Sequence, residues 1–200
     1  YIVVGIRRDV YMEKGIELVL PNEPSVCSVP TVGEAILDLS TYEVGYEPIY
    51  SPIPYTEQSD ISDYAHSMRQ GSASVKNHIT TKTTDKAMKR FKKIKQGKNF
   101  HSLGLEDKDT YSKPERTQNT IYLRLDPNKP SGTVVNVRKS MWIHPVLDRA
   151  ITVREAARLQ SFPDSFEFIG TKDSQYQQVG NAVPPLLAKG IATILLKYLK

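Results

Sequence analysis

Residues 149–164 read RAITVREAARLQSFPD, and this stretch predicts a short, well-bounded helix. Thr152 and Glu155 have the spacing of a capping box, in which the threonine hydroxyl and the glutamate carboxylate each satisfy a free backbone N–H group. Arg154, Glu155 and Arg158 are charged residues on a helix that otherwise looks half buried. Charges in such a place fit a catalytic role or a structural one, since buried pairs of charges specify geometry more reliably than they add stability.

A second informative stretch, residues 178–185, reads QVGNAVPP and precedes the last predicted helix. Proline is favoured in the first turn of a helix, so we expect this helix to begin at Pro184-Pro185 and to run for about four turns. Its large apolar residues fall on one stripe: Leu187, Ile191, Ile194, Leu195 and Tyr198.

The composition is that of a folded chain with its own core, since 39% of the 200 residues are apolar. No apolar run approaches the roughly 20 residues that a membrane span needs, and the first residues lack the layout of a signal peptide. We therefore expect a cytoplasmic protein without a membrane partner. The single cysteine, Cys27, cannot form an internal disulfide. No metal is expected, because no pair of histidines has zinc-ligand spacing; the four are His66, His78, His101 and His144.

The net charge of +5 is concentrated in one segment. From Lys76 to Lys98 there are nine basic residues and one acidic residue, Asp85, whereas the remainder has 18 basic and 21 acidic residues. A cationic patch of this kind suits the phosphate backbone of a nucleic acid, because each neutralised phosphate releases counterions. On charge alone, a solvated lysine-rich helix is an equally good interpretation.

The remaining pattern predicts a mixture of helices and strands. Thr31 and Glu34 form another capping box before a short helix, and a proline-rich crossing follows at 45–55. Helical spacing of apolar residues predicts a helix over 85–95, stopped by Gly97. Strands are predicted where β-branched and aromatic residues gather, at Tyr1 to Ile6, Thr120 to Leu125 and Gly132 to Val137.

Three of these stretches, in the same order, resemble the DNA cytosine-5 methyltransferase family. Residues 149–164 are similar to its ninth motif and residues 178–185 to its tenth, and residues 1–9 look like the strand that follows its eighth motif. The middle, roughly Gly45 to Trp142, then occupies the position of the family's variable target-recognition region. The chain thus resembles the C-terminal portion of such an enzyme. In the family the ninth motif organises the recognition domain, so the resemblance implies that Arg154, Glu155 and Arg158 form a structural motif and pair with the backbone or with each other.

The resemblance implies a mixed α+β (α/β) fold, in which a small target-recognition domain joins the terminal strand and helix of a Rossmann-like methyltransferase domain. It divides the chain into 1–44, the end of the catalytic domain and a connector; 45–148, the target-recognition domain; 149–178, a hinge formed by the ninth motif; and 179–200, the turn and helix of the tenth.

The resemblance also implies the chemistry. S-adenosylmethionine donates the methyl group, the target cytosine is flipped out of double-stranded DNA, and a cysteine thiolate adds to carbon 6 so that carbon 5 accepts the methyl group. That cysteine lies in a Pro-Cys loop of the N-terminal half. Cys27 lacks the preceding proline and the following glutamine, so we interpret it as an ordinary half-buried thiol and assign no catalytic residue. The chain alone is expected to be inactive and to need a catalytic N-terminal half as partner.

The tenth-motif turn carries the cofactor prediction. In the family this turn approaches the methionine end of S-adenosylmethionine, so Gly180, Asn181 and Ala182 are carried over as cofactor-binding residues. A structural role is the alternative, with Asn181 as a helix N-cap and Gly180 in a tight turn.

DNA contacts are expected from the middle region, on a protein associated with the bacterial nucleoid. Phosphate contacts, which position a protein without reading sequence, are predicted for Lys89, Arg90, Lys92, Lys93 and Lys95. Base readout needs donor and acceptor groups on loops that enter the major groove, and the candidates are Lys76, Asn77 and His78 together with the segment Asn136, Val137, Arg138 and Lys139.

Two other functions stay open at this point. The first is a stand-alone DNA-binding module that has lost catalysis and acts by occupying sites on DNA. A Pro-Cys-Gln loop encoded upstream would favour the methyltransferase over this module. A basic RNA-binding protein is the weaker alternative, because no aromatic ribonucleoprotein-type motif accompanies the lysines.

Overall fold

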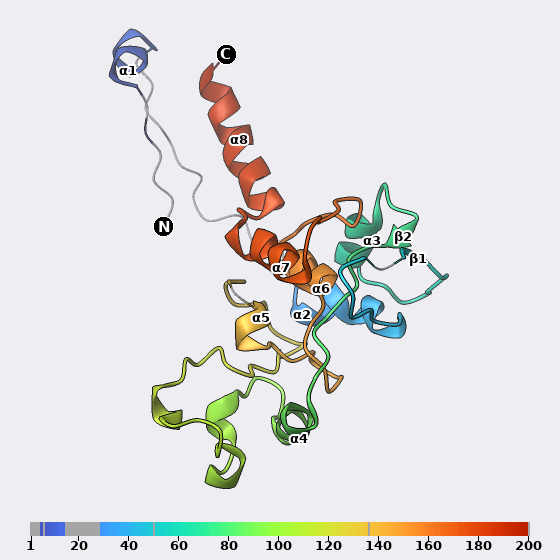
Figure 1. Ribbon diagram of the computed structural model, residues 1–200. Helices are drawn as coiled ribbons and strands as arrows, with labels where there is room; N and C mark the ends of the chain where they lie inside the picture. The colour runs from blue at the N-terminus through green and yellow to red at the C-terminus, as the bar shows by residue number, and fades with distance from the viewer. Residues whose placement is uncertain (1–4, 6, 15–28, 50, 136, 200) are drawn as a thin grey trace. The chain divides into compact units, whose positions relative to one another are not determined.

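The computed structural model groups the chain into two compact units (Figure 1). One unit comprises Tyr1–Ser28 with Leu186–Lys200, and the other comprises Val29–Pro185. The residues whose structure is described are 5, 7–14, 29–49, 51–135 and 137–199. The predicted strand at the N-terminus, apart from Gly5, and Cys27 lie outside the described residues, and the four-part division of the chain remains a prediction.

The described residues of the first unit include the helices α1 (Arg8–Lys14) and α8 (Pro185–Leu199). Helix α8 begins at a proline and is 15 residues long, as its sequence predicts. Leu187 and Leu196 on it are 45% and 55% exposed. This helix therefore presents apolar side chains that nothing in the described part of the chain fully covers.

One stretch, 172–196, is helical and apolar enough to cross a membrane when judged by length and composition alone. It consists of two helices, α7 (Lys172–Asn181) and α8, separated at 182–184. Tyr176 and Val179 of α7 are buried within the second unit. The stretch is thus interrupted, and its first helix belongs to the core of the second unit.

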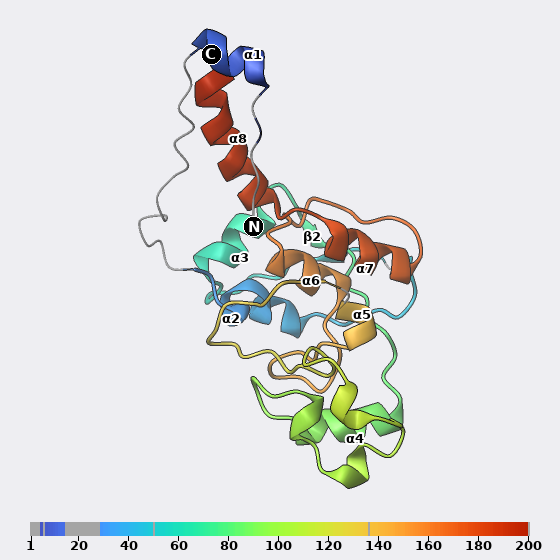
Figure 2. The same cartoon turned by 90° about the vertical axis from the view of Figure 1, so that its left-hand side faces the viewer.

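Four helices build the main core of the second unit: α2 (Val32–Ile36), α3 (Asp63–Arg69), α6 (Val153–Leu159) and α7. Helix α2 packs against α3 and α6, and α6 packs against α7; Figures 1 and 2 show this cluster from two sides. Ala156 and Ala157 of α6 are completely buried, which lets the neighbouring helices approach closely. Both predicted capping boxes are present, so the sequence located the starts of α2 and α6 correctly.

A second, smaller core forms around α4 (Asp85–Lys93). Tyr122 packs edge to face against the rings of both Phe91 of this helix and Phe100. Three 3-10 turns surround them, η2 (Phe100–Ser102), η3 (Leu105–Asp107) and η4 (Pro114–Arg116). The prediction of a helix over 85–95 is correct to within two residues.

The described residues contain one small sheet, in which β1 (Ile53–Pro54) pairs antiparallel with β2 (Ser74–Val75). The predicted strands at 120–125 and 132–137 are wrong. Tyr122 has a φ of 51°, which interrupts an extended run, and Val137 instead starts α5 (Val137–Ser140). Only isolated bridges, such as Arg124 with Ile143, remain there, because the apolar residues of these segments pack into the two cores instead of a ladder.

The main core also contains charges, and Arg158 of α6 makes the most contacts among them. Its guanidinium donates to both carboxylate oxygens of Asp164, at 2.6 and 2.8 Å. It also donates at 3.0 Å to Asp38 in the 3-10 helix η1 (Leu37–Thr41), which directly follows α2. Asp38 also accepts from Arg69 of α3. Charge-assisted, bidentate pairs of this kind fix geometry strongly, so one cluster joins α2, α3 and α6.

Glu155, the capping residue of α6, is buried between Arg149 and two histidines. Burial alone would raise the pKa of Glu155, but the Arg149 guanidinium 2.6 Å away outweighs it and lowers the pKa to about 2. Burial lowers the pKa of His144 to about 4, against the opposing effect of Glu155. His144 Nδ1 accepts from the backbone N–H groups of Val146 and Leu147, so protonation there would break both bonds.

These shifts predict that stability falls on acidification. Below pH 6.5 the unfolded chain binds a proton at His144, whereas the native state does not bind one there until about pH 4. The stability that Glu155 contributes is lost as the pH falls from 4.5 toward about 2. Urea unfolding, followed by fluorescence of Trp142, the only tryptophan, should lose about 2 kcal/mol from His144 between pH 7.5 and pH 5. His144→Asn keeps an acceptor and should remove that part of the decline, with exposed His66→Asn as control. An unchanged pH profile in His144→Asn would contradict the assignment.

Candidate nucleic-acid interface and cofactor contact

Part of the cationic segment is neutralised by acidic residues that follow it in the chain. Arg90 is 4% exposed and donates to Asp107 O at 2.6 Å and to the Thr110 hydroxyl at 2.7 Å. Lys93 pairs with Asp107, and Lys86 pairs with the exposed Asp109. Arg90 is thus a structural residue of the second core, and the structure leaves it unavailable to DNA phosphate.

Apart from Lys76, the other lysines of the segment remain exposed. Within the described part of the chain their side chains form no hydrogen bond or ion pair; they are Lys82, Lys89, Lys92, Lys95 and Lys98. Lys89, Lys92 and Lys95 belong to the predicted phosphate contacts, whereas Lys82 and Lys98 were not singled out. Five free cations on one segment form a surface that can bind a polyanion.

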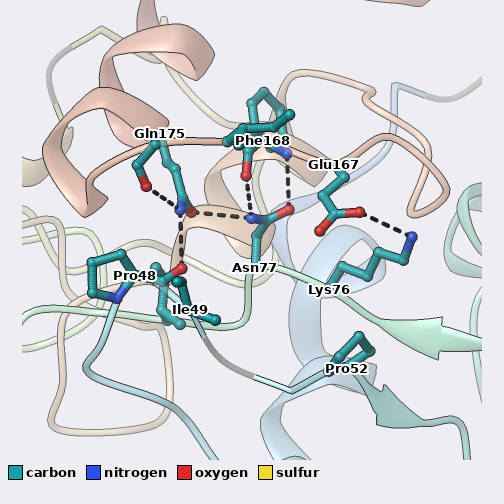
Figure 3. Close-up of a pocket in the computed structure, with 11 residues that line it drawn as sticks. Pro48, Ile49, Pro52, Lys76, Asn77, Glu167, Phe168 and Gln175 are labelled. Carbon is teal, nitrogen blue, oxygen red and sulfur yellow. Dashed lines mark hydrogen bonds and ion pairs between the residues drawn. The ribbon is translucent and has the colours of Figure 1, made fainter.

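The side chains of the predicted base-reading segment at 76–78 all have partners within the protein. His78 is completely buried, with Nδ1 3.2 Å from the Thr152 hydroxyl. Asn77 has a φ of 57°, and its side chain donates to Phe168 O at 2.8 Å and accepts from Phe168 N at 3.0 Å. Lys76 pairs with Glu167 beside a small pocket (Figure 3). These contacts make the segment a brace for the ninth-motif region, not a loop that reaches a DNA groove.

Arg154 links the 76–78 segment to the ninth-motif region. Its guanidinium is completely buried and donates to the backbone carbonyls of Lys76 at 2.9 Å and Pro163 at 3.1 Å, and also to that of Phe166. Arg154 and Arg158 therefore bind carbonyl and carboxylate oxygens within the protein, whereas Glu155 accepts from the Arg149 guanidinium and from Thr152 N.

The second predicted base-reading segment is only partly described. Asn136 lies outside the described residues, and Arg138 on α5 pairs with Asp173 on α7 at 2.5 Å. Lys139 on the same helix also has a partner within the protein. The structure brings these residues to the α5–α7 contact and not to the lysine surface of α4.

The predicted cofactor turn begins at the end of α7. Gly180 and Asn181 are its last residues and Ala182 is its C-cap, so the alternative role of Asn181 as an N-cap is wrong. A Cβ on Gly180 would lie 2.2 Å from Val135 O. The glycine is therefore required for close packing against Val135, and not for a tight turn. Asn181 is exposed and forms no side-chain bond within the described residues, so its amide is available to a ligand.

One structural residue escaped the sequence analysis. Arg124 is 6% exposed and donates to the carbonyls of Phe91 and Ile94 at 2.6 Å each, which satisfies the C-terminal end of α4, and it pairs with Asp148 at 2.5 Å. Its only sequence signal was a charged residue inside an otherwise apolar run. Among the described residues, no group of three or more potential metal ligands occurs.

The fold is shared with a solved structure described as a putative DNA modification methyltransferase encoded within a prophage of E. coli. The TM-score is 0.66 at 24% identity, over 91% of this chain and 51% of that chain. Residues 3–197 match the protein family described as C-5 cytosine-specific DNA methylase, and the chain belongs to this family.

Two curated relatives show how much of the family the chain represents. Type II methyltransferase M.DdeI of Desulfomicrobium norvegicum is 34% identical over 204 residues, which cover 94% of this chain and 48% of that protein. Type II methyltransferase M.AquIB of Picosynechococcus is 41% identical over 129 residues, which cover 59% of this chain and 85% of that protein. The chain therefore spans about half the length of M.DdeI but most of M.AquIB.

The Gly180 contact generates a stability prediction. Gly180→Ala should lower the free energy of unfolding by about 1–3 kcal/mol, because the added Cβ meets the backbone of Val135, which must shift. Gly132→Ala in the same unit is the control, since nothing lies within 4 Å of its Cβ position. Urea unfolding monitored through Trp142 measures both, and equal midpoints would refute the close approach of α7 to Val135.

Proposed function

We propose that this chain is the DNA-recognition and C-terminal part of a DNA (cytosine-5-)-methyltransferase of a type II restriction-modification system, and that it acts with a catalytic N-terminal half outside these residues. The observation that carries the proposal is a family match over residues 3–197 in a chain whose only cysteine, Cys27, lacks a Pro-Cys-Gln context. Because M.AquIB is matched over 85% of its length by only 129 residues, a type II methyltransferase chain of similarly small size has precedent.

The chain's own residues divide the work. The buried Arg154 and Arg158 contacts hold the ninth-motif region, and the exposed lysines of the α4 segment face the phosphate backbone. S-adenosylmethionine, the cofactor of the family, supplies the methyl group. Asn181 fits the role of a contact from one side of the cofactor site, because its amide is exposed and uncommitted, and the rest of the pocket belongs to the catalytic half.

The alternative is a stand-alone DNA-binding module without catalysis. Helix α8 favours the split enzyme, because Leu187 and Leu196 on it remain exposed while Ile191, Ile194 and Leu195 are only half-buried. Fully burying such side chains is worth roughly 1.5–3 kcal/mol each, and a partner that covers them would supply part of that. A catalytic half that covers α8 would complete both the core and the cofactor site.

Duplex binding should be weak and sensitive to salt. Five phosphate contacts predict a slope of log affinity against log salt of roughly −4 to −5. Replacing Lys89, Lys92 and Lys95 by glutamine should flatten the slope by about two to three. The control replaces Lys86 and Lys93 by glutamine. This variant also lowers the positive charge, but the lysines that it removes are already paired with aspartates. Equal flattening by both variants would place the interface elsewhere.

Methyl transfer should require both halves. With labelled S-adenosylmethionine and duplex DNA, the chain alone should transfer no label, and mixing it with the N-terminal half should restore transfer and give co-elution on size exclusion. Ile191→Asp with Leu195→Asp should abolish both, because the carboxylates would be buried at the joint.

The matched control adds the same two carboxylates off the stripe, as Ala192→Asp with Thr193→Asp, and should associate normally. Label transfer by the chain alone would overturn the split-enzyme proposal and return attention to Cys27. Co-elution that survives the stripe variant would show that α8 is not the joint.

A further inference from the structure

The segment 113–119 carries exposed polar side chains that are not engaged by other described residues. Arg116, Gln118 and Asn119 are exposed, and their side chains form no hydrogen bond or ion pair with any residue the structure describes. Lys113 at the start of the segment is likewise exposed. Arginine, glutamine and asparagine are the side chains that make bidentate bonds to base edges, so the residue types match DNA readout.

The backbone of the same segment is held firmly. His101 Nε2 lies 3.0 Å from Thr117 O, and Asn99 Nδ2 donates to Asn119 O at 2.8 Å. The Thr117 hydroxyl donates to Pro114 O at 2.8 Å. Behind it, Phe100 is completely buried in the second core, so the holding residues are themselves fixed. Uncommitted side chains on an immobilised backbone are preorganised for recognition.

The other candidate loops of the middle region serve the fold. The segment 126–131 packs on α2, where Val32 N donates to Lys129 O and Gly33 N to Pro127 O, each at 2.9 Å. A Cβ on Gly33 would lie 2.8 Å from Pro127 O, so this contact is close. Residues 76–78 are the brace described above, and the acidic residues at 107 and 109 neutralise α4. Among the described residues, 113–119 thus combines rigidity with free base-reading groups.

We propose that loop 113–119 is the element that reads the DNA sequence, with Arg116 and Gln118 as specificity-determining residues. This inference rests on the proposed DNA-recognition function and deepens it. In the major groove the Arg116 fork matches O6 and N7 of a guanine, and the Gln118 amide matches N6 and N7 of an adenine. The lysines of the α4 segment supply affinity independent of sequence, and the loop supplies the preference.

The test is selection of bound sequences from a duplex library with randomised positions, using the 200-residue chain. Wild type should enrich particular bases. Arg116→Lys keeps the charge but loses the bidentate fork, so it should leave the salt slope unchanged and reduce the preference for guanine at one position by about 10- to 100-fold. Gln118→Ala should do the same for adenine at another position.

The control is Lys92→Gln on α4, which should weaken binding to all sequences equally and leave the enriched bases unchanged. Trp142 fluorescence should give the same unfolding midpoint for all variants, because the substituted side chains are exposed. A wild-type preference that persists in both Arg116→Lys and Gln118→Ala overturns the loop assignment while the DNA-binding proposal stands. A wild-type chain that binds duplex without preference also overturns it. A chain that binds no duplex overturns the proposed function as well.

Discussion

The second unit depends on one buried ion cluster, the Arg158 guanidinium between Asp164 and Asp38. Tyr55 also donates to Asp164, and Tyr64 donates to the Arg158 carbonyl, so segments more than 90 residues apart meet around α6. Buried charges carry a desolvation cost that only complete pairing offsets. The cluster therefore specifies one arrangement of α2, α3 and α6 more than it adds stability.

The sequence could predict those elements whose signals are local. A threonine three residues before a glutamate defines a helix start whatever the rest of the fold, so α2 and α6 were located correctly, and α4 was found from its apolar spacing. The strands predicted at 120–125 and 132–137 failed because β-branched residues also suit irregular chain that packs into a core. Nothing local signals that Tyr122 adopts a left-handed conformation, and that single residue breaks the pattern.

The candidate sites show the same division between local and non-local information. Counting charges identified a cationic segment, but pairing depends on which aspartates fold back on it, and Asp107 and Asp109 lie 14 or more residues beyond the helix residues they meet. In the same way, Asn77 and His78 have side chains suited to base readout, yet the Asn77 amide is bonded to the Phe168 backbone and His78 is completely buried. Whether a side chain is free to bind DNA depends on its burial and on its partners in the fold, and these cannot be inferred from the local sequence.

The loop at 113–119 is held through the main-chain carbonyls of Thr117 and Asn119. Since every residue type supplies such a carbonyl, the side chains at 116, 118 and 119 can be exchanged without disturbing the anchors that hold them in place. Folding and recognition are thus encoded by different atoms of the same seven residues. In a lineage under pressure to change its DNA target, this loop could diversify rapidly while the surrounding scaffold accumulated few compensating substitutions.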